Sequence, residues 1–280
     1  MNYRHSFHAG NSADVVKHSL LIALVRALQL KQSALTLIDT HAGCGLYDLD
    51  GEEARRTGEA AQGVMRAFAC PNPLLNDYRS AVQAVNVGKN GGAGPRLYPG
   101  SPQILAQLLR SQDLLILNEK HAQDAYTLRG VMRGTSAAVH ERDAYELWLA
   151  LLPPRSPRGV VVVDPPYEQL NERELITATL AAAMRKWAHG VTVIWYPLKD
   201  RATHGRWKQQ LHNLGIPKLL GVEHWLYDND QPGIYNGAGL FIVNPPYTFT
   251  QALPPLLETL RAALAPEGHR GEITAAWLND

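Results

Sequence analysis

The chain is 280 residues long, which suits one large domain or two small ones, and its 45% of apolar residues are enough for a hydrophobic core. The 23 glycines and 18 prolines are spread along the chain, which excludes a disordered or collagen-like protein. The formal net charge of +1 excludes a polycation, so any contact with nucleic acid must rest on basic residues that gather locally.

The two cysteines, Cys44 and Cys70, are too few for a four-thiolate zinc site or a disulfide framework, which favours a reducing compartment. The first eight residues are polar, unlike a signal peptide, and no apolar run approaches the roughly 20 residues that a membrane span needs. We therefore expect a soluble, cytoplasmic protein with no membrane partner.

Three apolar runs each end in a polar residue followed by a turn, at residues 35–39, 114–119 and 160–164. Continuous Val, Ile and Leu runs of this length are typical of strands buried on both faces of a parallel sheet. Because the carboxyl ends of such strands carry the functional groups, the acid at the end of each run marks a candidate site.

Helical spacing of apolar residues supplies the crossover helices of an α/β fold, at residues 14–29, 101–109, 172–188 and 201–214. Further strands are predicted at residues 137–140, 191–196, 218–227 and 239–243. The last two are joined by a loop of turn formers that is too short for a helix, so we expect an antiparallel hairpin. The prediction is a doubly wound sheet of seven strands, mostly parallel, with the last strand antiparallel.

One spacing in this pattern is unusual. The ribose acid of a doubly wound nucleotide-binding fold follows the glycine turn by about 20 residues, but Glu119 lies 80 residues after Asp39. We therefore predict a single domain over residues 1–280 that carries a helical insertion at residues 48–97. The insertion is either a structural extension or a subdomain that grips substrate, since it leaves the sheet at its functional edge.

A glycine turn, Gly43-Cys44-Gly45, follows the first strand, where the chain must bend tightly beside a ligand. Many turns contain two glycines, so this signal is weak alone. Glu119 strengthens it, because a carboxylate at the next strand end can accept both hydroxyls of a ribose. Asp143, at a third strand end, is either a reader of an adenine amino group or a solvated helix cap.

The strongest motif is Asp164-Pro165-Pro166-Tyr167, directly after a buried strand. Two prolines hold the backbone rigid, so the Asp164 carboxylate and the Pro165 carbonyl are fixed at the sheet edge near an aromatic ring. These acceptors suit the two N–H groups of a planar amine stacked on Tyr167, and they would aim the nitrogen lone pair at an electrophile. The alternative is a merely rigid loop.

A second match, Asn244-Pro245-Pro246-Tyr247, follows the strand predicted to be reversed. The carboxyl end of that strand lies at the opposite edge from Gly43 and Glu119. We therefore expect Asn244 to have no catalytic role.

Two other classes of function were weighed. The histidines His5, His8, His18 and His41 with Asp39 and Asp164 would suit a metal-dependent phosphohydrolase or a nuclease acting on DNA. Those histidines lack fixed ligand spacing, and a metal site leaves the double proline unexplained, so no metal is expected. A non-catalytic RNA-binding module has no use for a carboxylate held rigidly beside a donor pocket.

The Asp39–Gly45 turn and the Asp164–Tyr167 motif together resemble S-adenosylmethionine-dependent amino methyltransferases. More specifically, the chain resembles the 23S ribosomal RNA adenine-N6 methyltransferase J family, over its whole length. The motifs that carry this likeness are residues 3–11 (YRHSFHAGN), 14–18 (DVVKH), 39–43 (DTHAG), 98–102 (YPGSP) and 164–167 (DPPY). The resemblance implies a Rossmann-like class I methyltransferase fold and methylation of adenine N6 in large-subunit ribosomal RNA.

The resemblance also implies roles for single residues. The S-adenosylmethionine site would consist of Lys17, His18, His41, Gly43, Ser101, Glu119, Asp143, Ala144 and Asp164. Asp164 would be the catalytic acceptor, aided by Pro165 and Tyr167, and the RNA would meet Tyr3, Arg4, His5 and Tyr167. Cys44 stands where members often have alanine, a small departure. Older descriptions link this family to the use of external DNA as a nutrient, but no nuclease-like constellation supports that role.

Basic residues are the candidates for holding phosphates beside an extruded base, namely Arg4, Lys17, Arg55, Arg56 and Arg66.

Overall fold

A computed structural model describes residues 4–88, 94–233, 235–265 and 268–279. One sheet of eight strands runs through its centre in the order β10-β8-β9-β7-β6-β1-β4-β5. The strands are β1 (Thr36–Asp39), β4 (Leu114–Asn118), β5 (Ala138–His140), β6 (Gly159–Val163), β7 (Val191–Leu198), β8 (Leu219–Trp225), β9 (Gly237–Val243) and β10 (Glu272–Asn279).

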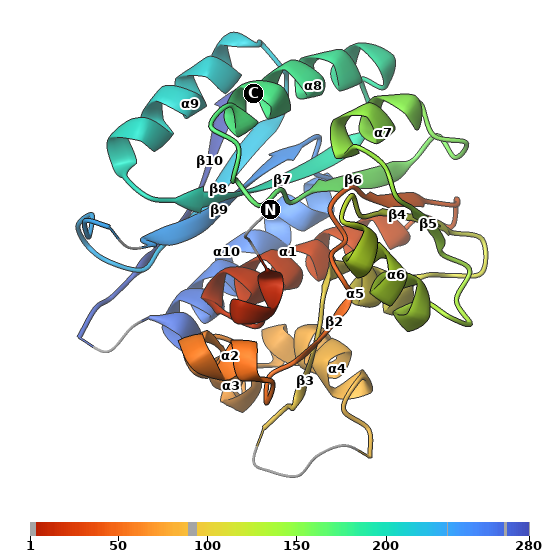
Figure 1. The fold of residues 1–280 in the computed structure, drawn as a ribbon. Coiled ribbons are helices and arrows are strands. Elements are labelled where there is room, and N and C mark those ends of the chain that lie inside the picture. The colour runs from red at the N-terminus through yellow and green to blue at the C-terminus, as the bar shows by residue number, and fades with distance from the viewer. Residues whose placement is uncertain (1–3, 89–93, 234, 266–267, 280) are drawn as a thin grey trace.

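Helices cover both faces of this sheet, as a doubly wound fold requires (Figure 1). Above it in Figure 1 lie α7 (Ala144–Ala150), α8 (Glu172–Lys186) and α9 (Arg201–Asn213). Below it lie α1 (Ser12–Gln29), α5 (Ser101–Leu108), α6 (Ala122–Val131) and α10 (Tyr247–Leu264). The four helices predicted from spacing are confirmed to within two residues at each end.

The pairing confirms the predicted strand directions. β1 pairs in parallel with β4 and β6, and β6 pairs in parallel with β7. β9 lies between β7 and β8 and is antiparallel to both, so the expected hairpin is present.

The predicted count of seven strands in the sheet is wrong, because β10 adds an eighth along the outer edge of β8. Most side chains of β10 are partly or fully exposed, and alanines separate its apolar residues Ile273 and Trp277. This segment therefore lacks the continuous apolar run that identified the buried strands.

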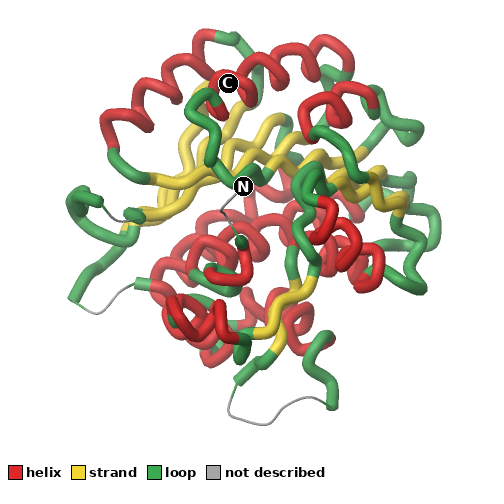
Figure 2. The backbone as a smooth tube through the Cα atoms, viewed as in Figure 1, coloured by secondary structure: helices red, strands yellow, loops and turns green. Residues whose placement is uncertain are grey.

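The insertion consists of short helices closed by a small antiparallel sheet of β2 (Leu46–Asp48) and β3 (Leu97–Pro99). Its α-helices are α2 (Glu52–Thr57), α3 (Val64–Ala69) and α4 (Asn76–Ala84), and it also contains short 3₁₀ helices at Glu59–Gln62 and Pro73–Leu75. A further 3₁₀ helix, His5–Phe7, precedes α1. Figure 2 shows these helices grouped beyond α1, on the side away from the sheet.

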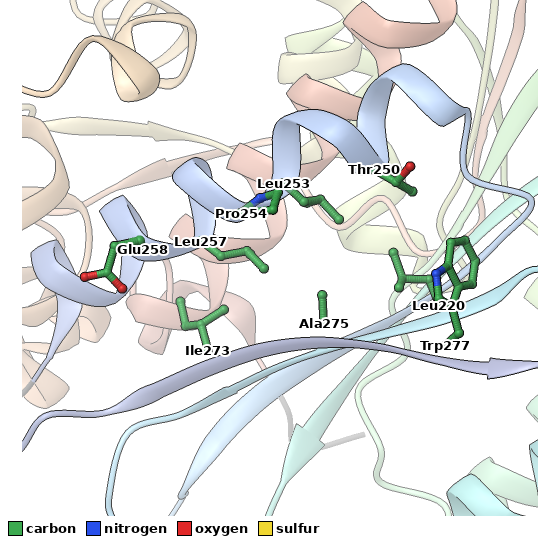
Figure 3. A pocket seen from close by; sticks show the side chains of 9 residues that line it. All are labelled: Leu220, Thr250, Leu253, Pro254, Leu257, Glu258, Ile273, Ala275 and Trp277. Carbon is green, nitrogen blue, oxygen red and sulfur yellow. The ribbon is translucent and has the colours of Figure 1, made fainter.

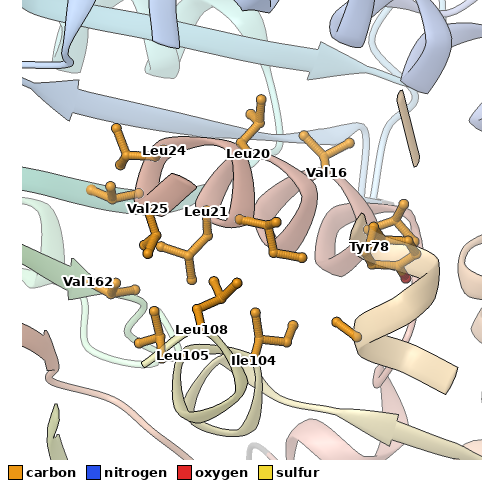
Figure 4. Packing of buried hydrophobic residues seen from close by; sticks show 14 of the residues in the cluster. Val16, Leu20, Leu21, Leu24, Val25, Tyr78, Ile104, Leu105, Leu108 and Val162 are labelled. Carbon is orange, nitrogen blue, oxygen red and sulfur yellow. The ribbon is translucent and has the colours of Figure 1, made fainter. Parts of the chain in front are cut away.

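The core is continuous from the sheet through α1 into the insertion. Val16, Leu20 and Leu21 of α1 are buried, and Leu21 points toward Leu105 and Leu108 of α5, whereas Val16 and Leu20 point to the opposite side of the helix (Figure 4). Tyr78 of α4 belongs to the same cluster as Val162 of β6. Because α1 is covered on nearly every side, its sequence is apolar around most of its circumference.

Candidate active site

The loops that follow the parallel strands line one cleft of about 1150 Å³. Every predicted site residue that the structure describes lies on its wall: Arg4, His5, Lys17, His18, His41, Gly43, Ser101, Glu119, Asp143, Ala144, Asp164, Pro165 and Tyr167. Tyr3 lies outside the described residues. The structure therefore brings together at one edge the side chains that the sequence separates by more than 150 residues.

The glycine turn after β1 is joined to the end of β4 through Glu119. The Gly43 N–H donates to Oε2 of Glu119 at 2.8 Å, and the His121 N–H donates to Oε1 at 2.8 Å. Gly43 has φ +58°, and a Cβ there would lie 2.5 Å from the Tyr47 hydroxyl oxygen. Glycine suits this turn because its backbone is left-handed and the Tyr47 hydroxyl occupies the space of a side chain.

Glu119 is 9% exposed, and burial raises the pKa of its carboxyl. We expect Glu119→Gln to weaken S-adenosylmethionine binding by about 1 to 3 kcal/mol. The amide nitrogen of glutamine cannot accept a hydrogen bond, so one buried donor that the carboxylate would bind is left without an acceptor. Calorimetric titration measures this directly. The exposed Glu141, changed to Gln, is the matched control and should keep wild-type affinity. Equal affinity in both variants would place the ribose elsewhere.

His18 and His41 form a neutral polar wall. Burial lowers the pKa of His18 to about 3, and the Lys17 ammonium adds to this effect. Its Nδ1 lies 2.8 Å from the Tyr98 hydroxyl, whereas Nε2 is buried and has no hydrogen-bond partner among the described residues. Burial lowers the pKa of His41 to about 4.

Ser101 begins α5 and is 5% exposed at the cleft. Behind it lies Asp39, whose Oδ1 accepts the His41 N–H at 3.2 Å and whose pKa is raised to about 7 chiefly by burial. Asp39 itself does not line the cleft, so its carboxyl supports the wall from behind.

Asp143 caps α7, one of the two roles that the sequence allows it. Its Oδ1 accepts the N–H groups of Tyr145 at 3.0 Å and Glu146 at 3.2 Å, and Oδ2 accepts from Lys120 at 2.9 Å. An ionised carboxylate has about four lone-pair sites, so capping does not use up its capacity. Ala144, the next residue, is 4% exposed and lines the same wall.

Asp164 is held by a buried chain of charges that starts in α1. The Lys17 ammonium lies 2.6 Å from Oδ2 of Asp164 and 2.9 Å from Oδ1 of Asp14. Oδ2 of Asp14 in turn lies 2.9 Å from Nε2 of His5 and accepts the Gly10 N–H. The Lys17 side chain is only 5% exposed, and the two carboxylates raise its pKa against the effect of burial. Lys17 therefore orients the Asp164 carboxylate and is too enclosed to hold an RNA phosphate.

Asp14 is a site residue that the sequence reasoning missed. Its side chain is 2% exposed, and the charges of His5 and Lys17 hold its pKa well below the usual range despite burial. The available signal was its spacing, since residues three apart lie on the same face of a helix.

Tyr167 has an unusual backbone, with φ +53°, at the turn that follows the two prolines. Its hydroxyl donates to the Trp195 carbonyl oxygen at 2.7 Å, and the two rings meet edge to face with centroids 5.9 Å apart. This bond fixes the Tyr167 ring beside Asp164, and Trp195 joins it on the cleft wall.

Asn244 lies outside the cleft, as its strand direction predicts. The end of β9 pairs with the start of β7, through Val243 and Thr192, and this is the opposite edge of the sheet. The Asn244 amide donates to the carbonyl oxygens of Ala188 and Gly190, so its role is to hold a turn.

The basic residues predicted to contact phosphates differ in their exposure and in their partners. Arg55 and Arg56 are exposed on α2, whose first residues line the cleft. Arg4 is exposed and pairs with Glu53 at 3.0 Å. Arg66 instead donates to the Ala265 carbonyl oxygen at 2.7 Å and ties the insertion to the end of α10, so its expected contact with phosphate is withdrawn.

The four histidines of the rival metal hypothesis have separate partners. His5 contacts Asp14, His8 contacts Glu59, His18 contacts Tyr98 and His41 contacts Thr40. Within the described residues, no group of three His, Cys, Asp or Glu side chains is arranged to hold a metal ion.

The described helices include none that is long and apolar enough to cross a membrane.

A smaller hollow of about 400 Å³ lies between α10 and β10 (Figure 3). Leu253, Leu257 and Trp277 line it, and it shares no lining residue with the cleft. The polar constellation is confined to the larger cleft.

The fold and the site together define a Rossmann-like methyltransferase. Its features are an acid after each of several neighbouring parallel strands, a glycine turn, and a rigid Asp-Pro-Pro-Tyr loop at the same edge of the sheet. The comparisons with known proteins agree. The family model described as "RsmJ: Ribosomal RNA large subunit methyltransferase D, RlmJ" matches residues 32–279, and the chain belongs to this family.

Two curated relatives cover nearly the whole chain. The chain is 37% identical over 283 residues to "Ribosomal RNA large subunit methyltransferase J" of Escherichia coli K12, with 99% of each chain covered. It is 36% identical over 280 residues to the protein of the same description from Haemophilus influenzae, again with 99% of each covered. A crystal structure of a Legionella pneumophila protein matches with a TM-score of 0.85 and 31% identity, over 96% of this chain and 98% of that one.

Proposed function

We propose that this methyltransferase transfers a methyl group from S-adenosylmethionine to N6 of an adenine in 23S ribosomal RNA. The observation that carries the proposal is the rigid Asp164–Tyr167 loop at the cleft wall, with its carboxylate held by Lys17. Membership in a family of large-subunit ribosomal RNA methyltransferases supports the choice of RNA.

The residues present fit S-adenosylmethionine. The turn at Gly43 lines the cleft, and Nε2 of His18 is a buried polar atom at the cleft without a partner among the described residues. Glu119 would accept the ribose hydroxyls, and Asp143 with Ala144 would meet the adenine. Lys17, His41 and Ser101 would complete the polar wall. S-adenosylmethionine supplies an electrophilic methyl group on a positively charged sulfur.

Asp164 acts on the amino group of the target base. Its Oδ2 is bound by Lys17, so Oδ1 and the Pro165 carbonyl oxygen are the acceptors for the two N–H bonds. Accepting both bonds favours a pyramidal nitrogen whose lone pair points along the line of attack. The main contribution of this carboxylate is to position the nitrogen for attack. The N6 proton becomes strongly acidic once the nitrogen has four bonds, and it then leaves to Asp164 or to water.

The RNA side of the cleft is proposed from charge and exposure. The target base must be extruded to lie against Tyr167, and Arg4 and His5 lie on the cleft wall close to the start of the chain. Arg55 and Arg56 extend from the insertion, which we propose is part of one domain over residues 1–280 and contacts the RNA. We place the enzyme in the cytoplasm.

We expect the double change of Arg55 and Arg56 to Gln to weaken RNA binding and to lower the logarithmic salt slope by roughly 1.4 to 1.8, because each phosphate contact contributes about 0.7 to 0.9. Filter binding or fluorescence anisotropy across a salt series measures the slope. Arg66→Gln is the matched control: it should keep the wild-type slope, since Arg66 bonds to Ala265. A wild-type slope in the double variant would make the insertion a structural extension only.

The proposed function is tested in cells by mass spectrometry of nucleosides from 23S ribosomal RNA of a deletion strain. N6-methyladenosine at one site should disappear on deletion and return with the wild-type gene. An unchanged nucleoside profile would overturn the proposal.

A further inference from the structure

The loop that carries Asp164 and Tyr167 also carries the most exposed large apolar side chain in the described part of the chain. Leu170 has a relative exposure of 105%, whereas the next such side chain, Tyr247, has 74%. Residues 168–171 are all exposed, and Glu168 and Gln169 line the cleft. Leu170 therefore stands on the rim of the proposed active site without covering any part of the core.

The loop is anchored on both sides of Leu170. Before it, the Tyr167 hydroxyl donates to the Trp195 carbonyl oxygen at 2.7 Å. After it, the N–H groups of Glu172 and Leu175 donate to the carbonyl oxygens of Gln169 and Asn171. In Figure 1 the loop is green and runs in front of the sheet. A leucine presented to water on a fixed support gains free energy when an apolar surface covers it.

We infer that Leu170 enters the base stack of the substrate RNA and fills the place that the target adenine leaves. This inference rests on the proposed function. Proteins that unstack nucleic acid insert apolar side chains such as leucine between bases. Only three residues separate Leu170 from Tyr167, a span of at most about 11 Å, so one loop reaches both the extruded base and the adjacent gap. Leu170 is thus a positioning residue that stabilises the extruded state and touches no reacting atom.

The charges around the rim suit this placement. Arg4 and Lys120 line the cleft with side chains 71% and 65% exposed, each in a solvent-exposed ion pair, with Glu53 and Asp143, and Lys199 is an exposed lining residue on a third segment. These cations come from separate elements around the opening, where phosphates flanking an extruded base would lie. An inserted Leu170 side chain needs such phosphate contacts to keep the RNA backbone in place around it.

The test compares Leu170→Ala with wild type on two substrates: the shortest base-paired stem of 23S ribosomal RNA that wild type methylates, and the isolated strand carrying the same adenine. We expect kcat/KM on the stem to fall about tenfold, since unstacking one base step costs a few kcal/mol, and kcat/KM on the strand to change less than twofold. Leu170→Met should retain activity on the stem. Leu30→Ala, at an exposed leucine after α1, is the matched control and should match wild type on both.

A second readout follows extrusion directly. With 2-aminopurine in place of the target adenine, wild type should raise the fluorescence of the stem, and Leu170→Ala should raise it less. Equal losses on stem and strand, or no loss on either, would overturn the insertion of Leu170. If wild type methylates no stem of 23S ribosomal RNA and no isolated strand from it, the proposed function is overturned instead.

Discussion

Asp164→Asn should lower methyl transfer by about 10²- to 10³-fold or more, the usual effect of removing one preorganised polar contact to a reacting group. The asparagine side chain has nearly the same shape, but its amide has one acceptor atom and a nitrogen that donates. Whichever way it turns, it cannot both receive the Lys17 ammonium and accept from the target amine as the carboxylate does. Single-turnover transfer of a labelled methyl group measures the rate.

Binding of S-adenosylmethionine should survive the same substitution, within about threefold, because the polar wall from Gly43 to Glu119 is untouched. The matched control is Asn244→Gly in the second Pro-Pro-Tyr segment. Glycine tolerates the φ of +52° at this position, so the variant should fold and transfer methyl at the wild-type rate. If Asn244→Gly lost activity as Asp164→Asn does, the assignment of the two edges of the sheet would be wrong.

Lys17→Met should be the most destabilising single change at the site. Removing one partner of a buried ion pair costs about 3 to 5 kcal/mol, and here two carboxylates, Asp14 and Asp164, lose the ammonium between them. Turnover should fall as well, because the Asp164 carboxylate loses the contact that fixes its orientation. Urea unfolding measures the free energy of unfolding. The rate of methyl transfer is measured without urea, at a temperature at which the variant is folded.

Lys208→Met offers the comparison, since Lys208 also lies close to a carboxylate, that of Glu223, at 2.5 Å. Its side chain is 33% exposed, and Glu223 keeps His204 and Trp225 as partners, so the expected loss is about 1 kcal/mol. Methyl transfer by this variant should be unchanged. Equal stability losses at Lys17 and Lys208 would show that the Lys17 pair is no more important than an ordinary surface contact.

Much of the fold was predictable because burial and sequence agree in the parallel strands. Gly159–Val163 is buried along its whole length and reads as a continuous apolar run. β10 gave no such signal, since an edge strand with exposed residues needs no apolar pattern. The two-stranded sheet of β2 and β3 escaped prediction for a related reason: each strand has three residues, too few for a periodicity to be read.

The candidate site was predictable wherever a polar residue follows a strand, because chain direction alone brings Glu119, Asp143 and Asp164 to one edge. The partner of each residue was not predictable. Lys17 was expected at the cofactor or at a phosphate, and nothing in the sequence indicated that the packing of α1 places its ammonium between Asp14 and Asp164. Such a contact across 147 residues depends on the tertiary structure and leaves no local pattern.

One measurement tests the central claim most directly. The purified protein is incubated with unmethylated 23S ribosomal RNA and with S-adenosylmethionine that carries a deuterated methyl group, and the nucleosides are then analysed by mass spectrometry. The account predicts deuterated N6-methyladenosine with wild type and none with Asp164→Asn. Label on any other nucleoside, no label with wild type, or equal label with Asp164→Asn would contradict it.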